Sequence, residues 1–207
     1  MGKIIPKYAR VPLLLCAVTQ FLAYYLPRML PRLPYTVDMA TPLDRMVTVA
    51  PAWIAVYVAA YLYWIVGYIA IARVSTGVCR RFFRADYLAK AVAMISFIFL
   101  PTYLPRAQVV SGGAFGWLLR AIYAADAPNN LFPSMHCSVS WLIARQIGAL
   151  SAFRSAVKAA AFAFSILVFL STLFTGQHLI ADVFGGMLLA EGALYVSRKW
   201  AVHEAQI

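Results

Sequence analysis

Two histidines and one aspartate are the residues of this sequence best suited to chemistry. His136 follows Pro133-Ser134-Met135, and His178 follows Gly176-Gln177 and stands four residues before Asp182. Residues four apart share one face of a helix, so we expect Asp182 to accept a proton from one imidazole nitrogen and leave the other nucleophilic. A second imidazole, His136, can protonate a departing oxygen. The pattern predicts nucleophilic catalysis with general acid assistance.

Phosphate is the group that these surroundings fit best. Pro133 and Ser134 are typical of a helix start, and helix starts bind anions through unpaired backbone N–H groups. Arg106 is the first candidate for a bidentate phosphate contact, and Arg120 is the second. We therefore predict that Arg106 and Arg120 bind phosphate, near a helix start whose backbone N–H groups suit an anion. Ordinary helix capping by Ser134 and anchoring of Arg106 at a membrane interface are the alternatives.

The composition places this chemistry in a membrane. Of 207 residues, 63% are hydrophobic and 12% are charged, far from the balance of a soluble domain. The net charge of +11 is spread between apolar runs, which is typical of membrane-surface loops and argues against nucleic acid as a partner. Cys16, Cys79 and Cys137 are widely separated and are predicted to be free thiols. No linker divides the chain, so we expect one domain over residues 1–207.

The hydrophobic pattern predicts an all-α, polytopic membrane protein with a bundle of about six transmembrane helices. A helical span needs roughly 20 mainly apolar residues. The first run lacks a cleavage site and is expected to be retained as a helix. The expected spans are residues 11–26, 47–72, 88–104, 134–150, 156–174 and 178–197.

The basic residues predict how this bundle lies in the membrane. Arg73, Arg80, Arg81 and Arg84 form the densest basic cluster, which we expect in a cytoplasmic loop. With six spans, both termini then also lie in the cytoplasm. The helix starts that carry the two histidines lie at the extracytoplasmic face, in what we expect to be a bacterial-type plasma membrane.

Two motifs resemble those of the type-2 phosphatidic acid phosphatase superfamily. The family's Pro-Ser-Gly-His resembles Pro133-Ser134-Met135-His136, and its Ser-Arg-x5-His-x3-Asp resembles Ser171-Thr172, then His178 and Asp182 at the same spacing. The resemblance implies a six-helix membrane bundle with a site that uses no metal and no cofactor. It also implies that His178 forms a phosphohistidine, Asp182 orients it, His136 protonates the leaving group, and Ser134 with nearby backbone holds phosphate.

The sequence also departs from those motifs. Met135 replaces a glycine, Thr172 replaces an arginine, and the family's Lys-x6-Arg-Pro has no full match. The stretch from Pro101 to Arg106 looks more like the branch that includes inositol phosphorylceramide synthases. That branch contains transferases, in which an alcohol resolves the phosphohistidine in place of water. The resemblance covers approximately residues 100–185.

These observations predict a membrane lipid phosphatase that hydrolyses a phosphate monoester or diphosphate on a phosphorylated lipid. A lipid phosphotransferase acting on an alcohol acceptor is the first alternative. A zinc or iron site formed by His136, His178 and Asp182 is another. A lipid transporter or binding protein is the non-enzyme alternative, supported by Glu191 within an apolar helix. The lipid and the oligomeric state cannot be read from the sequence.

Overall fold

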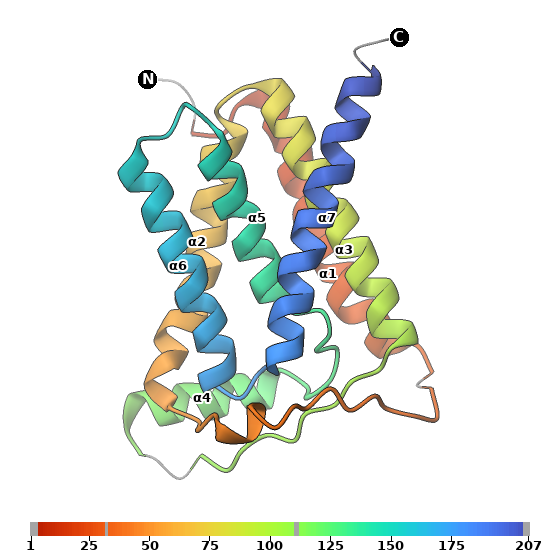
Figure 1. The fold of residues 1–207 in the computed structure, drawn as a ribbon, viewed down its shortest axis with the longest axis vertical. Helices are drawn as coiled ribbons and strands as arrows, with labels where there is room; N and C mark the ends of the chain where they lie inside the picture. Colours follow the sequence, from red (N-terminus) through yellow and green to blue (C-terminus); the bar gives the residue numbers. More distant parts are fainter. Residues whose placement is uncertain (1–3, 32, 110–111, 205–207) are drawn as a thin grey trace.

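The computed structural model describes residues 4–31, 33–109 and 112–204, with side chains described through Trp200. Within these ranges it is all-helical, and six long helices run side by side while a shorter one crosses one end (Figure 1). Both termini lie at the opposite end. The helices are α1 Lys7–Met29, α2 Ile54–Ala72, α3 Thr76–Phe99, α4 Gly113–Ala125, α5 Met135–Ala149, α6 Ser155–Phe174 and α7 Ile180–Glu204.

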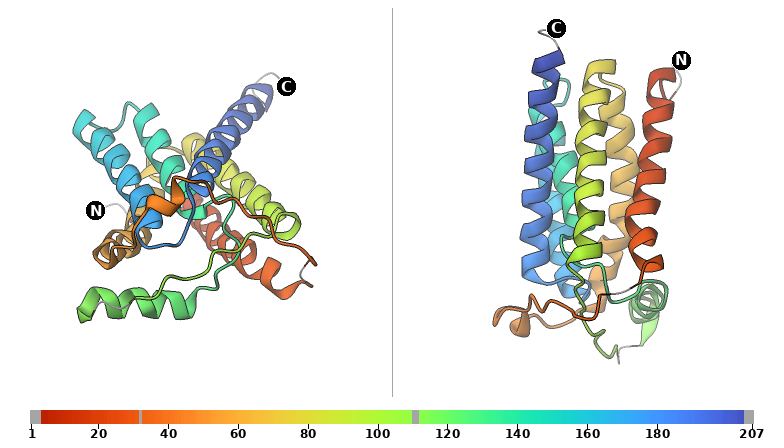
Figure 2. Two further views of the ribbon diagram at one scale, coloured as in Figure 1. Left: turned by 60° about the horizontal axis from the view of Figure 1, so that its bottom comes forward. Right: turned by 90° about the vertical axis from the view of Figure 1, so that its right-hand side faces the viewer.

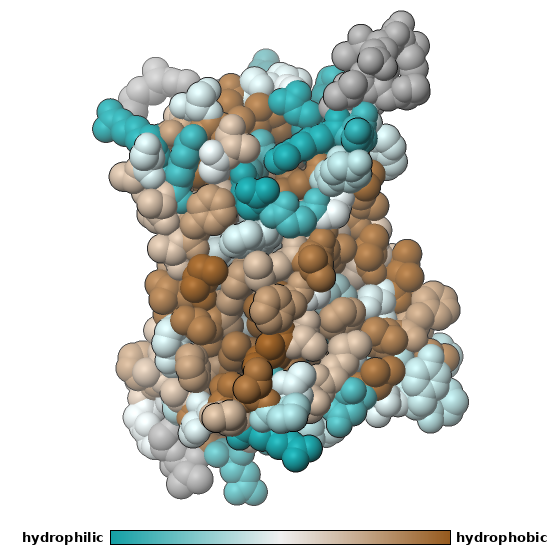
Figure 3. Space-filling model, in the orientation of Figure 1, coloured by the Kyte–Doolittle hydropathy of each residue, from teal (hydrophilic) through white to brown (hydrophobic). Residues whose placement is uncertain are grey.

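The membrane character follows from helix length and composition. Among the described residues, four helical stretches are long and apolar enough to cross a membrane, namely Lys7–Met29, Pro51–Ala72, Ser155–Phe174 and Ile180–Trp200. α5 has only 15 residues, and α3 carries several charges, yet both run alongside the other four. Figure 3 shows, on the face in view, an apolar band across the middle of the molecule with more polar surfaces toward both ends. The predicted all-α polytopic membrane fold is confirmed.

Five of the predicted spans lie within a few residues of observed helices, but the third, residues 88–104, was wrong. α3 begins at Thr76, where the Ser75 side chain accepts a hydrogen bond from the Val78 N–H, and ends at Phe99, just before Pro101. Arg80, Arg81 and Arg84 therefore lie on the first turns of a helix and not in a loop. Hydropathy missed these turns because their side chains are charged although their backbone is helical.

α4 was not predicted at all. It lies across the end of the bundle that is remote from the termini, as Figure 2 shows in two orientations. Leu119 is buried against Ile54 and Tyr57, whereas Phe115 and Trp117 are exposed on its outer side. An amphipathic helix of 13 residues is too short to span a bilayer, which is why a search for spans passed over it.

A buried polar cluster joins three helices in the half of the bundle that contains the termini. On α3, the Lys90 Nζ lies 2.7 Å from an Asp86 carboxylate oxygen, and both side chains are almost fully buried. The Tyr68 hydroxyl of α2 donates to Asp86 at 2.6 Å, and Lys90 donates to the Cys16 carbonyl of α1 at 3.1 Å. The pair thus ties α1 and α2 to α3.

Glu191 on α7 is also explained by contacts within the bundle. It accepts a 2.8 Å hydrogen bond from the Trp141 indole and pairs with the Arg145 guanidinium, both on α5. Glu191, the residue that supported the transporter alternative, therefore forms a hydrogen-bonded contact between two helices.

Removing one partner of the buried pair should destabilise the fold more than removing both. Lys90→Met leaves the Asp86 carboxylate buried without its cation, which should cost about 3–5 kcal/mol of unfolding free energy. The double variant Asp86→Leu/Lys90→Met should recover most of that loss because no charge remains buried. Thermal unfolding in detergent measures both. Equal destabilisation by the single and double variants would contradict this account.

Candidate active site

A tight turn between α6 and α7 fixes the backbone of His178. Gly176 follows the end of α6 with φ +59°, a left-handed conformation that favours glycine. The N–H groups of Gln177 and His178 then both donate to the Thr172 carbonyl, at 3.0 and 3.1 Å. Thr172 itself is fully buried, so the residue that replaces the family's arginine holds the turn through its backbone.

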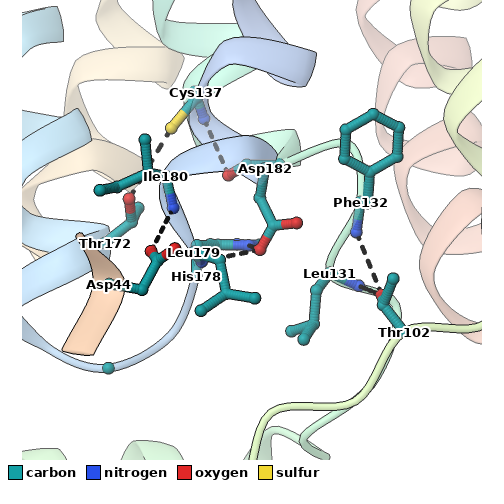
Figure 4. Close-up of polar contacts among 12 residues, drawn as sticks. Asp44, Thr102, Leu131, Phe132, Cys137, Thr172, His178, Leu179, Ile180 and Asp182 are labelled. Carbon is teal, nitrogen blue, oxygen red and sulfur yellow. Dashed lines mark hydrogen bonds and ion pairs between the residues drawn. The ribbon is translucent and has the colours of Figure 1, made fainter. Parts of the chain in front are cut away.

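The pairing of His178 with Asp182 does not arise from a shared helical face, and that part of the prediction was wrong. α7 begins at Ile180, so His178 lies before the helix. Asp182 turns back toward the helix start, where its Oδ2 accepts the Leu179 N–H at 2.8 Å and lies 3.3 Å from the His178 Nδ1 (Figure 4). The buried carboxylate thus engages Nδ1 and leaves Nε2 of the imidazole for a substrate.

Asp44 supports the same turn, a role that the sequence did not indicate. It lies in a loop far earlier in the chain, and its Oδ1 accepts the Ile180 N–H at 2.7 Å, capping α7 (Figure 4). Burial raises the pKa of Asp44, but hydrogen bonds from Thr41 and the Ile180 backbone outweigh it and hold the pKa below its usual value. The cap is therefore a carboxylate at neutral pH.

His136, the second residue of α5, lies in an aromatic setting provided by α2. Its ring stacks on Tyr57 with centroids 4.2 Å apart, and the rings of Trp64 and Tyr61 lie 4.9 and 5.5 Å away. The Trp64 indole is itself held by a 2.9 Å hydrogen bond to Ser140. The His136 Nε2 has no hydrogen-bond partner in the described part of the chain. Tyr57, Tyr61 and Trp64 have the spacing of one helix face, which is the sequence signal for this aromatic wall.

The two histidines come together because α5 and α7 begin in close contact. Their ring centroids are 6.4 Å apart, and the Ser134 N–H donates to the Asp182 carbonyl at 3.0 Å, which joins the two helix starts directly. Gly186 allows this approach, because a Cβ there would lie 2.5 Å from the Ser134 carbonyl oxygen. Gly185 does the same beneath the Phe132 ring. Small residues at a helix crossing permit such backbone contact.

Both imidazoles line one cavity of about 520 Å³. Part of its wall is polar and belongs to the segment between α4 and α5, and most of the rest is aromatic and belongs to α1 and α2. The residues on α1 and α2 are Ala17, Gln20, Phe21, Tyr24, Tyr25, Tyr57, Tyr61 and Trp64.

The cavity reaches the side of the bundle. α1 packs mainly on α3 and makes no comparable contact with α2. Phe21 and Tyr25 of α1 and Tyr61 of α2 line the cavity and are also exposed on the outer surface of the bundle. The opening between these two helices therefore faces the region that lipid occupies.

The predicted phosphate-binding residues are not on this cavity wall. Ser134 is fully buried and caps α5, accepting the Cys137 N–H at 3.4 Å. Arg106 lies in the segment after α3 and donates to the carbonyls of Gly176 and Asp126, both at 3.2 Å. Arg120 is on the exposed side of α4 and donates to a backbone carbonyl. Phosphate binding by these three residues stays a prediction.

The metal-ligand alternative lacks a ligand set in the described ranges. There, no group of three or more His, Cys, Asp or Glu side chains is arranged to hold a metal ion. The Asp182 carboxylate accepts a hydrogen bond from the Leu179 N–H and lies next to the His178 Nδ1. The cavity wall next to His136 is formed by aromatic side chains.

A methyl group at Gly186 should separate the two helix starts and uncouple the histidines. Gly186→Ala meets a backbone oxygen that cannot rotate away, and a shift of 1 Å between catalytic groups reduces turnover by about 100-fold. Gly192→Ala on the same helix is the matched control, because a Cβ there has open space. Turnover and thermal unfolding should be measured for both. Unchanged turnover in Gly186→Ala would contradict the role of this contact.

Comparison with known proteins agrees with this geometry. No curated protein and no solved structure gives a significant match. A family model described as the PAP2 superfamily matches residues 36–196, a range that contains both histidines, Asp182 and the loop with Asp44. The match does not distinguish the synthase-like branch from the rest. Because it covers most of the chain, the chain belongs to the PAP2 superfamily, the type-2 phosphatidic acid phosphatases.

Proposed function

We propose that this protein is a membrane lipid phosphatase that hydrolyses a phosphate monoester or diphosphate through a phosphohistidine. The observation that carries the proposal is one cavity that holds both imidazoles and is lined by exposed aromatic side chains of α1 and α2, from which we infer an opening toward lipid between these helices. Family membership supports phosphatase-type chemistry in general. The lateral opening favours a substrate whose apolar part stays in the bilayer.

The geometry suits a division of labour between the two imidazoles. Asp182 engages the His178 Nδ1, so Nε2 attacks phosphorus and forms the phosphohistidine. His136 donates a proton to the departing oxygen from Nε2, the atom that has no other partner in the described residues. Water then attacks the phosphohistidine while His136 takes its proton, which releases phosphate and restores both rings. A separation of 6.4 Å between ring centroids leaves room for one phosphoryl group between them.

The charge distribution supports placing this cavity on the extracytoplasmic side. The end that carries the termini also carries the arginines at the start of α3 and both basic residues Arg198 and Lys199. The positive-inside rule assigns that end to the cytoplasm. The cavity lies at the opposite end.

Removing either imidazole should abolish or severely slow turnover. His178→Ala should release no phosphate from phosphatidate, sphingolipid phosphates or isoprenoid diphosphates, and His136→Ala should slow release about 100- to 10,000-fold. His203→Ala is the matched control for loss of a histidine. Vanadate should inhibit the wild type, and chelators should not. Full activity in His178→Ala would refute the phosphohistidine, and loss of activity with a chelator would favour a metal site.

Filling the lateral opening should impair lipids selectively. Ala17 lines the cavity on α1, and Ala17→Phe places a ring in the opening. The KM for a long-chain lipid phosphate should rise about tenfold, with little change for a short-chain, water-soluble phosphate. Val18→Phe is the control, since Val18 is exposed on the same helix but does not line the cavity. Equal loss for both substrates would argue against entry between α1 and α2.

A further inference from the structure

We propose that the cavity contains a second subsite, centred on Asp126, that binds a hydroxyl-rich alcohol group. The inference rests on the proposed function and adds a binding site for the alcohol group that carries or accepts the phosphoryl group. The ligand is either a headgroup that the lipid carries or a free alcohol that accepts the phosphoryl group. The two sources share one chemistry, a cluster of uncharged hydroxyl groups.

Asp126 is a carboxylate on the wall of a cavity that otherwise suits phosphate. It follows the last residue of α4, and its side chain is 25% exposed. The Tyr24 hydroxyl of α1 donates to its Oδ1, and the Arg28 Nη2 lies 2.9 Å from the same oxygen. The Arg106 Nη2 lies 3.7 Å from Oδ2. Asp126 lines the cavity, but neither arginine does, so the guanidinium groups support the carboxylate from behind.

Three amide side chains extend this polar wall. Asn129, Asn130 and Gln177 all line the same cavity as Asp126 and the two histidines. Gln177 is only 2% exposed and its Nε2 has no hydrogen-bond partner in the described residues. The Asn129 Oδ1 is likewise buried without one. Buried polar groups nearly always have a partner, so an unpaired donor and acceptor on one cavity wall indicate a ligand that supplies both.

The charges at this wall select the class of ligand. The Asp126 carboxylate offers only hydrogen-bond acceptors, so an unprotonated phosphate oxygen gains no hydrogen bond from it, which places the phosphorus nearer the imidazoles. An ammonium headgroup is disfavoured because Arg28 and Arg106 already neutralise the carboxylate. Two neighbouring hydroxyl groups can donate one hydrogen bond each, to the Asp126 carboxylate and to the Asn129 carbonyl oxygen, and either can accept from the Gln177 amide. Hydroxyl groups therefore satisfy this wall without adding charge.

The subsite can be tested with Asp126→Asn, which keeps the size of the side chain and removes its charge. For a lipid whose phosphate monoester is attached to a glycerol headgroup, or for phosphoryl transfer to free glycerol or inositol, KM should rise about 10- to 100-fold, the effect of losing one or two hydrogen bonds to a charged acceptor. The KM for phosphatidate, which lacks a headgroup, should change less than twofold. Asp38→Asn is the control, an exposed loop aspartate at the same end of the bundle that does not line the cavity.

The products distinguish the two sources of the alcohol. A phosphorylated free alcohol marks an acceptor, and preferential turnover of a lipid with a hydroxylated headgroup marks a substrate group. An equal effect of Asp126→Asn on phosphatidate and on the hydroxylated substrates would overturn the subsite while leaving the phosphatase intact. Preferential phosphoryl transfer to free ethanolamine over free glycerol would also overturn it.

Direct binding tests the subsite even if none of these lipids is turned over. Calorimetric titration of the purified protein with free inositol should give binding that Asp126→Asn and Gln177→Leu weaken about tenfold or more. Ethanolamine should bind more weakly than inositol to the wild type. The subsite is refuted if the wild type does not bind inositol, or if the wild type and Asp126→Asn bind it equally well.

Discussion

The contact between the start of α5 and the start of α7 is the constraint on which the site depends. His136 lies in the first turn of α5 and His178 lies just before α7, and neither histidine can be moved toward the other by side-chain rotation alone if the backbones are apart. The hydrogen bond from the Ser134 N–H to the Asp182 carbonyl sets the register of the two starts. Gly186 removes the side chain that would otherwise separate them. The Asp182 residue therefore serves twice, with its carbonyl toward α5 and its carboxylate toward the His178 ring.

Loops that are distant in sequence stabilise the contact between the starts of α5 and α7. Asp44 caps α7, and the Thr102 hydroxyl accepts the N–H groups of Leu131 and Phe132 just before α5 (Figure 4). The Arg106 guanidinium bonds to the carbonyl of Gly176 in the turn before His178. Each support satisfies backbone groups that the helices leave unpaired at their ends. The irregular segments between the spans are thus part of the site.

The sequence was a good guide to the membrane spans and to which residues lie together, and a poor guide to how they do so. Hydropathy located most helices because a bilayer demands long apolar stretches, but it failed where charge and helix coincide, at the start of α3, and where a helix lies across the bundle, at α4. The spacing of His178 and Asp182 indicated a contact that exists, although through a helix cap. The roles of Asp44 and Asp126 could not be predicted because their neighbours in space are far away in the chain.

The position of α1 beside the cavity affects which parts of a bound molecule the protein can distinguish. α1 packs on α3 and makes no comparable contact with α2, so the cavity ends in an opening and not in a closed pocket. In the proposed function, a hydrocarbon tail that leaves through this opening remains dissolved in the bilayer and touches no wall that could measure its length. We infer that such a protein would discriminate among molecules by the atoms nearest the phosphorus and would treat tails of different length as equivalent.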